Sequence, residues 1–513
     1  MKLREVMEGV EGRRGRIPDV EVGGIAHDSR QVKPGYAFVA LPGSTVDGRK
    51  FARDAVERGA AVVVAEGGVE LPEGAFQVAV DDSWVALARM SANFNGHPSR
   101  RMQVIGITGT NGKTSTAGLC EAVLTRAGYR VGVLGTINYR WAGREIPATL
   151  TTPFATEIQS YLREMSDAGC DAAVMEVSSH ALAQHRTEFI EFDRAILTNI
   201  TLDHLDYHGT FGDYCRAKMR LFQSLQPNEH NGGTTAIINL DDKQAGQVMS
   251  LVRGARLTYG IESSADVRAR DVVSDEGGVS FTAATPEGEV PVRLPLIGIH
   301  NVYNALAAMA CGVSYRVVPE VIAEALATVR SVPGRFEVVS SDSDFLVVVD
   351  YAHTPDALES AIRAARQLCR GKLRTVFGCG GDRDPSKRPI MGGIAEQTSE
   401  VVYVTSDNPR SEDPDAIIMD ILAGMSQGKT DQVHVEPDRR RAITRAILEA
   451  QSGDLVLVAG KGHENYQILG DTVVPFDDRD VAREALRLRK EGGDWPAGGG
   501  GPGQSVLCVG TGW

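Results

Sequence analysis

The chain reads Ile107-Thr108-Gly109-Thr110-Asn111-Gly112-Lys113-Thr114-Ser115 where an apolar run passes into a helical pattern. Glycines in such a turn let backbone N–H groups face phosphate oxygens, the Lys113 ammonium adds positive charge, and the Thr114 hydroxyl can coordinate magnesium. The strict pattern G-x-x-x-x-G-K-[ST] is not met, because Ile107 stands where its first glycine is required. A turn that merely joined a strand to a helix would not need Lys-Thr at the helix start. The stretch therefore predicts a loop that binds nucleotide phosphates.

Strands and helices alternate on both sides of this loop. Four apolar runs predict the strands of a doubly wound, mostly parallel central sheet: 103–107, 172–176, 194–197 and 235–239. Earlier apolar runs at 36–41 and 60–65 predict a small α/β unit. A later series predicts a third unit, with strands at 345–349, 374–377, 401–405 and 455–459.

The alternation breaks at 93–98 and again at 331–334. These breaks divide the chain into expected domains at 1–98, 99–331 and 332–491, all of the α/β class. The tail, 492–513, is rich in glycine, and this composition predicts disorder.

The bulk composition restricts the classes of protein to be considered. The net charge of −13 argues against a nucleic-acid-binding protein, which usually carries a basic face. The seven cysteines form no C-x-x-C pair, which indicates a reducing compartment. No stretch reaches the roughly 18 apolar residues of a membrane helix, and the N-terminus lacks an apolar signal core. We expect a cytoplasmic protein without nucleic-acid partners and without membrane insertion.

Polar residues follow two further central strands. Glu176 ends the strand before Val177-Ser178-Ser179-His180, where a carboxylate can hold magnesium or can simply face solvent. The run 198–209 follows the next strand, and its His204, with Asp203 and Asp206, suggests a second cation site. Lys218 lies on the following predicted helix, where an ordinary solvated lysine is the simpler interpretation.

Together these runs resemble the Mur ligases, a family of ATP-dependent amide ligases. Other stretches that carry the resemblance are Asp28-Ser29-Arg30, 43–48, His300-Asn301, 333–337 and Asp350-Tyr351-Ala352-His353. The resemblance spans about residues 20–480, which makes chance agreement improbable. It implies an N-terminal UDP-binding domain, a central P-loop ATPase-like domain and a C-terminal Rossmann-like domain.

The resemblance also implies roles for individual residues. Lys113, Lys218, His204 and Arg335 would be catalytic. Lys218 would be carbamylated, so that it joins Thr114, Glu176 and His204 as a ligand of Mg²⁺. ATP, as a substrate, would be bound by Gly109, Thr110, Asn111, Gly112, Lys113, Thr114, Ser115, Asn301, Arg335 and Asp350.

The second implied substrate is UDP-N-acetylmuramoyl-L-alanyl-D-glutamate. Its binding residues would be Ser29, Ser44, Thr45, Val46, Thr151, Thr152, Ser178, Gln184 and Arg186. This chain departs from the family pattern at Leu150, because some members carry a polar substrate contact at that position, just before the two threonines.

The C-terminal domain points to the amino-acid substrate. Arg410 ends the run Asp407-Asn408-Pro409-Arg410, and a guanidinium matches a carboxylate such as the distal one of meso-diaminopimelate. The run resembles the diaminopimelate-adding members of the family, in which Arg383, Gly460 and Glu464 would complete the pocket and Glu464 would pair with the distal ammonium. Lysine lacks the distal carboxylate and would leave the arginine unpaired.

The expected reaction transfers the γ-phosphoryl group of ATP to the D-glutamyl carboxylate, and an amine then displaces phosphate. Closure of the C-terminal domain about a hinge at 330–335 would shield the acyl phosphate from water. The alternatives are a lysine-adding ligase of the same family or a P-loop kinase or NTPase. A dehydrogenase is disfavoured, because Arg383 stands where G-x-G-x-x-G needs glycine. We expect a monomer.

Overall fold

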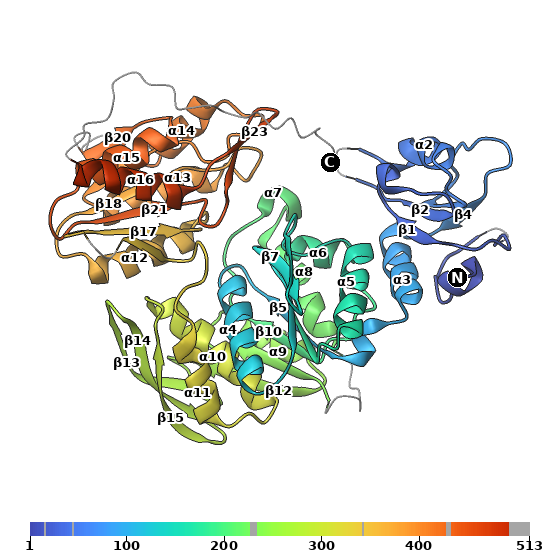
Figure 1. Ribbon diagram of the computed structural model, residues 1–513, viewed down its shortest axis with the longest axis horizontal. Helices are drawn as coiled ribbons and strands as arrows, with labels where there is room; N and C mark the ends of the chain where they lie inside the picture. The colour runs from blue at the N-terminus through green and yellow to red at the C-terminus, as the bar shows by residue number, and fades with distance from the viewer. Residues whose placement is uncertain (15–16, 44–45, 226–232, 341–342, 427–431, 492–513) are drawn as a thin grey trace.

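The computed structural model describes residues 1–14, 17–43, 46–225, 233–340, 343–426 and 432–491. The tail at 492–513, for which disorder is predicted, and the predicted substrate contacts Ser44 and Thr45 lie outside the described residues. Three α/β units, each built on its own sheet, follow one another along the chain (Figure 1). The α/β fold with parallel sheets is thus confirmed.

The N-terminal unit is a four-stranded parallel sheet. Its strands are β1 (Gly24–Ala26), β2 (Tyr36–Ala40), β3 (Val62–Glu66) and β4 (Gln77–Val80). The helices beside it are α1 (Leu3–Val6), α2 (Ala52–Glu57) and α3 (Ser83–Asn95). Asp82 caps α3 through the Val85 N–H, and Gly96 ends the helix in a left-handed conformation. The chain then leaves for the central unit through the short helix η3 (Pro98–Arg101).

The central sheet has eleven strands in the order β15-β14-β13-β12-β11-β10-β5-β9-β6-β7-β8. Its parallel part comprises β5 (Gln103–Thr108), β6 (Val131–Leu134), β9 (Ala172–Glu176), β10 (Arg194–Leu197), β11 (Thr235–Asn239), β12 (Ala255–Gly260) and β13 (Val267–Asp275). Antiparallel strands extend both edges: β7 (Asn138–Trp141), β8 (Arg144–Pro147), β14 (Gly278–Thr285) and β15 (Gly288–Leu294). These extensions are not among the strands predicted from the sequence.

Helices cover both faces of this sheet, so that it is doubly wound. One hydrophobic core contains α4 (Lys113–Arg126), α10 (Ile299–Ser314) and α11 (Pro319–Thr328). The core on the other face contains α5 (Ala155–Asp167), α8 (Phe211–Gln223) and α9 (Ala245–Leu251). Two short helices, α6 (Ser179–Ala183) and α7 (Leu205–His208), follow strand ends. The buried strands are apolar on both faces, as parallel strands between two helical layers must be.

The C-terminal sheet has the order β16-β17-β21-β18-β19-β20 and is parallel except for β16. Its strands are β16 (Glu337–Ser340), β17 (Leu346–Asp350), β18 (Leu373–Phe377), β19 (Val401–Val404), β20 (Val433–Val435) and β21 (Leu455–Ala459). The helices are α12 (Pro355–Leu368), α13 (Lys387–Thr398), α14 (Pro414–Leu422), α15 (Arg439–Leu448) and α16 (Asp478–Lys490). A hairpin of β22 (Tyr466–Leu469) and β23 (Thr472–Pro475) follows β21.

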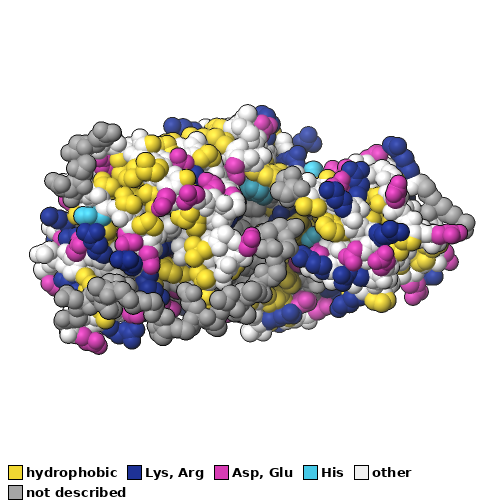
Figure 2. Space-filling view, turned by 90° about the horizontal axis from the view of Figure 1, so that it is seen from above, with side chains coloured by type: hydrophobic (Ala, Val, Ile, Leu, Met, Phe, Trp, Pro, Cys, Tyr) yellow, Lys and Arg dark blue, Asp and Glu magenta, His cyan; other side chains and the backbone are white. Residues whose placement is uncertain are grey.

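The molecular surface in Figure 2 shows the N-terminal unit as a narrower lobe beside the other two. On this face Lys and Arg side chains are interspersed with Asp and Glu side chains. Within the described residues, no helix is long and apolar enough to cross a membrane.

Candidate active site

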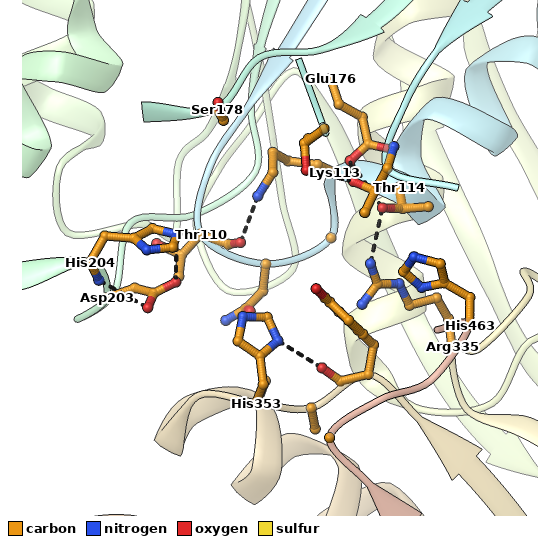
Figure 3. A pocket seen from close by; sticks show the side chains of 18 of the residues that line it. Thr110, Lys113, Thr114, Glu176, Ser178, Asp203, His204, Arg335, His353 and His463 are labelled. Carbon is orange, nitrogen blue, oxygen red and sulfur yellow. Dashed lines mark hydrogen bonds and ion pairs between the residues drawn. The ribbon is translucent and has the colours of Figure 1, made fainter. Parts of the chain in front are cut away.

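A cavity of about 890 Å³ lies between the central and C-terminal units. Loops that follow β5, β9 and β10 line one wall, and loops that follow β17, β18, β19 and β21 line the other. The carboxyl ends of parallel strands thus meet across the cavity, which is where α/β folds bind ligands. Figure 3 shows part of the lining, with Lys113 at the centre of the phosphate loop.

The loop between β5 and α4 has glycine where no other residue fits. Gly109 has φ +152°, and a Cβ there would lie 1.8 Å from Thr198 Oγ1. Gly112 has φ +84°, and a Cβ there would lie 2.5 Å from Asn304 Oδ1. The backbone can therefore curl tightly ahead of the N-terminus of α4, whose free N–H groups favour an anion. Lys113 Nζ lies inside this curl and donates to the carbonyls of Gly109 at 2.9 Å and Thr110 at 2.8 Å.

Lys218 reaches the same loop from α8. Its side chain is buried, at 2% exposure, and Nζ donates to Gly109 O at 2.7 Å. Nζ also lies 4.6 Å from the centroid of the Tyr214 ring. The interpretation of Lys218 as a solvated lysine is therefore wrong. Burial, followed by repulsion from Lys113, lowers the pKa of Lys218 well below its usual value.

Glu176, at the end of β9, does not face solvent, since it is 2% exposed. Its Oε2 accepts hydrogen bonds from Thr114 Oγ1 at 3.0 Å and Thr136 Oγ1 at 2.8 Å, and its Oε1 accepts one from the Thr136 backbone at 2.8 Å. Arg335 donates to Thr114 Oγ1 at 3.1 Å and its guanidinium lies over the Tyr351 ring. The group formed by Thr114, Glu176 and Arg335 occupies one side of the phosphate loop in Figure 3.

His204 and Asp203 occupy the opposite side of the loop (Figure 3). His204 Nε2 lies 3.3 Å from Asp203 Oδ2. Burial, opposed by the Asp203 charge, lowers the pKa of His204 to about 2. The imidazole is therefore neutral, which leaves a ring nitrogen able to bind a metal ion.

The predicted cation cluster of His204, Asp203 and Asp206 is not formed by these side chains. Among the described residues, no three His, Cys, Asp or Glu side chains gather as a group that could hold a metal ion. Magnesium, however, often takes only one or two carboxylates from a protein and its remaining ligands from phosphate and water. The Glu176 carboxylate beside the Thr114 hydroxyl, with neutral His204 across the loop, fits that mode.

Thr152, Ser178 and Arg186 line the cavity beyond the phosphate loop. Thr152 Oγ1 donates to the Glu176 carbonyl at 2.8 Å, and the Ser178 backbone donates to Thr152 Oγ1 at 3.0 Å. Arg186 donates to the Thr152 carbonyl and lies 4.1 Å over the Phe154 ring. Phe154 is not among the residues predicted from the sequence, yet its aromatic ring gives the guanidinium a fixed surface to pack on.

Two arginines face the same cavity from the C-terminal unit. Arg410 donates to Gly381 O at 2.7 Å, and Arg383 donates to Asp382 O at 3.1 Å. Burial, followed by repulsion from Arg383, lowers the pKa of Arg410. Within the described residues neither guanidinium has a carboxylate partner in an ion pair. Two adjacent guanidinium groups with only carbonyl partners form a site suited to an anion.

Acidic and amide side chains lie beside these arginines. Asn408 Nδ2 donates to Glu464 Oε2 at 2.9 Å. Gly460 has φ +120°, and a Cβ there would lie 2.6 Å from Asp407 Oδ2. All four residues line the cavity. The C-terminal wall therefore offers cationic and anionic groups side by side, as an amino acid with charges of both signs requires.

Most of the predicted site residues lie on this one cavity. They are Thr110, Asn111, Gly112, Lys113, Thr114, Ser115, Thr151, Thr152, Glu176, Ser178, Arg186, His204, Lys218, Arg335, Asp350, Arg383, Asp407, Asn408, Arg410, Gly460 and Glu464. The described part of its lining does not include Ser29, Val46, Gly109, Gln184, Asn301 or Pro409.

Asn301 shows why one predicted residue is displaced from the cavity wall. Its Nδ2 donates to Ile297 O at 2.8 Å, and its Oδ1 accepts from Asn304 Nδ2 at 3.0 Å. The neighbours His300 and Asn304 line the cavity instead. A helix turns about 100° per residue, so the exposed face could have been found only with the helix orientation known.

Comparison with known proteins identifies related chains. Three family models match: one described as Mur ligase family, catalytic domain, over 21–101, the Mur ligase middle domain over 107–312, and the Mur ligase glutamate ligase domain over 334–462. The chain is 46% identical over 491 residues to the UDP-N-acetylmuramoyl-L-alanyl-D-glutamate–2,6-diaminopimelate ligase of Solibacter usitatus, covering 95% of this chain and 98% of the relative. It is 44% identical over 496 residues to the protein of the same name from Geobacillus thermodenitrificans, covering 96% and 100%. A solved structure with that name matches at 32% identity and a TM-score of 0.67, covering 96% of this chain and 99% of the other.

Proposed function

Because this chain belongs to the Mur ligase family, we propose that it joins meso-diaminopimelate to UDP-N-acetylmuramoyl-L-alanyl-D-glutamate in peptidoglycan biosynthesis, at the expense of ATP. The observation that carries the substrate assignment is the pair Arg383 and Arg410, which lack carboxylate partners among the described residues and face the cavity that holds the phosphate loop. Diaminopimelate supplies the matching distal carboxylate, whereas lysine does not.

The phosphates of ATP would lie on the loop 109–115 and the N-terminus of α4, with Arg335 and Asp350 at the junction to the C-terminal unit. Thr114, Glu176, His204 and a carbamylated Lys218 would hold Mg²⁺, which neutralises phosphate charge during transfer. The carbamate forms from a neutral amine and CO₂ with release of a proton. The low pKa of buried Lys218 makes the neutral amine accessible.

The muramoyl dipeptide would enter beside Thr151, Thr152, Ser178 and Arg186, with Gln184 supporting Arg186 through a hydrogen bond at 2.8 Å. The N-terminal contribution would come from Ser29, Ser44, Thr45 and Val46. The γ-phosphoryl group passes to a D-glutamyl carboxylate oxygen and ADP departs. The amine of diaminopimelate then attacks the carbonyl carbon, phosphate leaves, and the amine loses a proton. Lys113 and Arg335 would neutralise the developing charge.

The amino acid would be held by Arg383, Asp407, Asn408, Pro409, Arg410, Gly460 and Glu464.

The proposed domains are 1–98, 99–331 and 332–491. A cytoplasmic location and a monomeric state remain part of the proposal, and gel filtration with light scattering tests the latter.

The function is tested by phosphate release from ATP with Mg²⁺, the UDP-linked dipeptide and either meso-diaminopimelate or L-lysine. We expect release, and a tripeptide of the correct mass, with diaminopimelate alone. Equal turnover with lysine would still support a ligase of this family but would contradict the role of Arg410 in selecting diaminopimelate. Phosphate release that depends on neither amino acid would indicate an NTPase.

A further inference from the structure

Lys461 is a buried cation that the proposed mechanism does not use. It follows Gly460 directly after β21, and its side chain has 0% exposure. Within the described residues it is not part of the cavity lining, whereas its neighbours Gly460 and Glu464 are. A lysine is rarely buried unless its charge is compensated, so its partners indicate its role.

The Lys461 ammonium has two hydrogen-bond acceptors and an aromatic ring around it. Nζ donates to Glu464 Oε2 at 2.8 Å and to Asn408 Oδ1 at 3.1 Å. It also lies 5.4 Å from the centroid of the Tyr466 ring, within the range of a cation–π contact. Because the side chain is fully buried and, among the described residues, lies outside the cavity lining, the ammonium acts on these neighbours and not on a substrate.

Lys461 also determines which way the Asn408 amide faces. Asn408 Oδ1 accepts from Lys461 Nζ and, at 3.0 Å, from the Ile468 backbone N–H. If the Asn408 amide were flipped, its NH₂ group would face two hydrogen-bond donors, Lys461 Nζ and the Ile468 N–H. Nδ2 must therefore face Glu464, to whose Oε2 it donates at 2.9 Å.

Both of these bonds to Glu464 fall on one carboxylate oxygen. Oε2 accepts from Lys461 and Asn408, while Oε1 has no hydrogen-bond partner among the described residues. Glu464 lines the cavity, so Oε1 is the oxygen available to a ligand. Burial raises the pKa of Glu464, whereas the charge of Lys461 and the hydrogen bonds from Lys461 and Asn408 oppose that rise.

We propose that Lys461 is a positioning residue that holds the Glu464 carboxylate by Oε2, directly and through Asn408, so that Oε1 receives the distal ammonium of the amino-acid substrate. This inference deepens the proposed function and rests on it. Lys461 thereby sets selectivity for an amino acid with a second amine without touching that amine. Arg383 and Arg410 act on the distal carboxylate instead.

The experiment compares two amino acids with the variant Lys461→Met. Meso-diaminopimelate has the distal amine, and L-2-aminopimelate is the same diacid without it. We expect KM for diaminopimelate to rise on the order of tenfold, the usual scale for a lost hydrogen bond to a charged group. KM for 2-aminopimelate, or its inhibition constant against diaminopimelate if it is not turned over, should stay unchanged, as should KM for ATP and for the UDP-linked dipeptide.

Arg410→Ala provides the matched control, because it should weaken both amino acids, which share the distal carboxylate. Equal losses for the two amino acids in Lys461→Met would show a merely structural role and overturn the proposal. An unchanged KM for diaminopimelate would overturn it as well. The wild-type protein is assayed first: a lack of release dependent on diaminopimelate would refute the proposed function, whereas selectivity changes in the variants test Lys461 alone.

Two further variants keep the test decisive if Lys461→Met unfolds. Lys461→Gln retains a donor for Asn408 and Glu464, so it should raise KM for diaminopimelate less and leave 2-aminopimelate unaffected. Adding either Lys461 substitution to Glu464→Gln should cause no further loss, because the carboxylate to be positioned is gone. Additive losses in the double variant would contradict the proposal.

Discussion

At the scale of single residues, the site depends on positions where only one side-chain type is compatible with the surrounding atoms. Gly109 is the clearest, since a Cβ would meet Thr198 Oγ1 at 1.8 Å. Lys218 and Glu176 are equally buried, at 2% exposure each. Both keep polar partners around the loop, which fixes their geometry before a substrate arrives.

Gly109→Ala should abolish most of the ligase activity. The added methyl group must displace Thr198 or the loop itself, and a shift of about 1 Å in catalytic geometry costs on the order of a hundredfold in rate. The measurement is kcat/KM for ATP by phosphate release, with circular dichroism to confirm folding.

Gly118→Ala, in α4, is the control, because its Cβ would meet nothing within 4 Å. Alanine should stabilise the helix by about 0.5–1 kcal/mol in urea denaturation and leave activity intact. A Gly109→Ala enzyme as active as Gly118→Ala would contradict the tight-loop argument.

At the scale of helices and strands, a buried ion pair supports two loops of the proposed amino-acid pocket. Arg439, the first residue of α15, and Asp478, the first of α16, are both 0% exposed and 2.7 Å apart. Arg439 also donates to the Ala459 carbonyl at 2.9 Å and to the Ser406 carbonyl at 3.4 Å. These carbonyls immediately precede the loops that begin at Gly460 and Asp407.

Asp478→Asn should destabilise the C-terminal unit by about 3–5 kcal/mol, because it leaves the Arg439 charge buried without a counter-ion. Thermal and urea unfolding measure the loss. The same two helices carry an exposed pair, Arg440 with Glu484, for comparison. Glu484→Gln should change the free energy of unfolding by about 0–1 kcal/mol. Similar losses for the two variants would refute the importance of burial.

At the scale of the whole molecule, polar contacts join the central and C-terminal units beside the cavity. Asn111 on the phosphate loop donates to Asp356 at 2.9 Å, and Arg335 donates to Thr114. Gly334 lies in the connection with φ +66°, and a Cβ there would lie 2.0 Å from the backbone nitrogen of His463. The connection thus lies against the loop that carries Lys461 and Glu464, so a shift of the connection would disturb the proposed amino-acid pocket.

Gly334→Ala should impair two substrates at once. The clash displaces either the connection, with Arg335, or the 460–464 loop, so KM should rise for ATP and for diaminopimelate together. Steady-state kinetics with each substrate varied in turn measures the effect. Gly128→Ala has a similar backbone strain, at φ +96°, but no atom within 4 Å of its Cβ. Gly128→Ala should lower stability without raising KM for either substrate. If KM rises in Gly128→Ala as well, backbone strain alone would explain the effect of Gly334→Ala.

The sequence by itself determined the α/β class and the phosphate loop, because strand–helix alternation and glycine-rich turns are local patterns. Most of the other predicted site residues came from the resemblance to the Mur ligases, and most of them line the cavity. It could not place the edge hairpins β7–β8 and β14–β15, nor turn Asn301 away from the cavity. Lys218 resembles a solvated lysine in the chain, and no local pattern singles out Lys461, yet both are buried. Only the tertiary structure decided their environment, since burial and hydrogen-bond partners come from residues as far apart as Gly109 and Lys218, or Asn408 and Lys461.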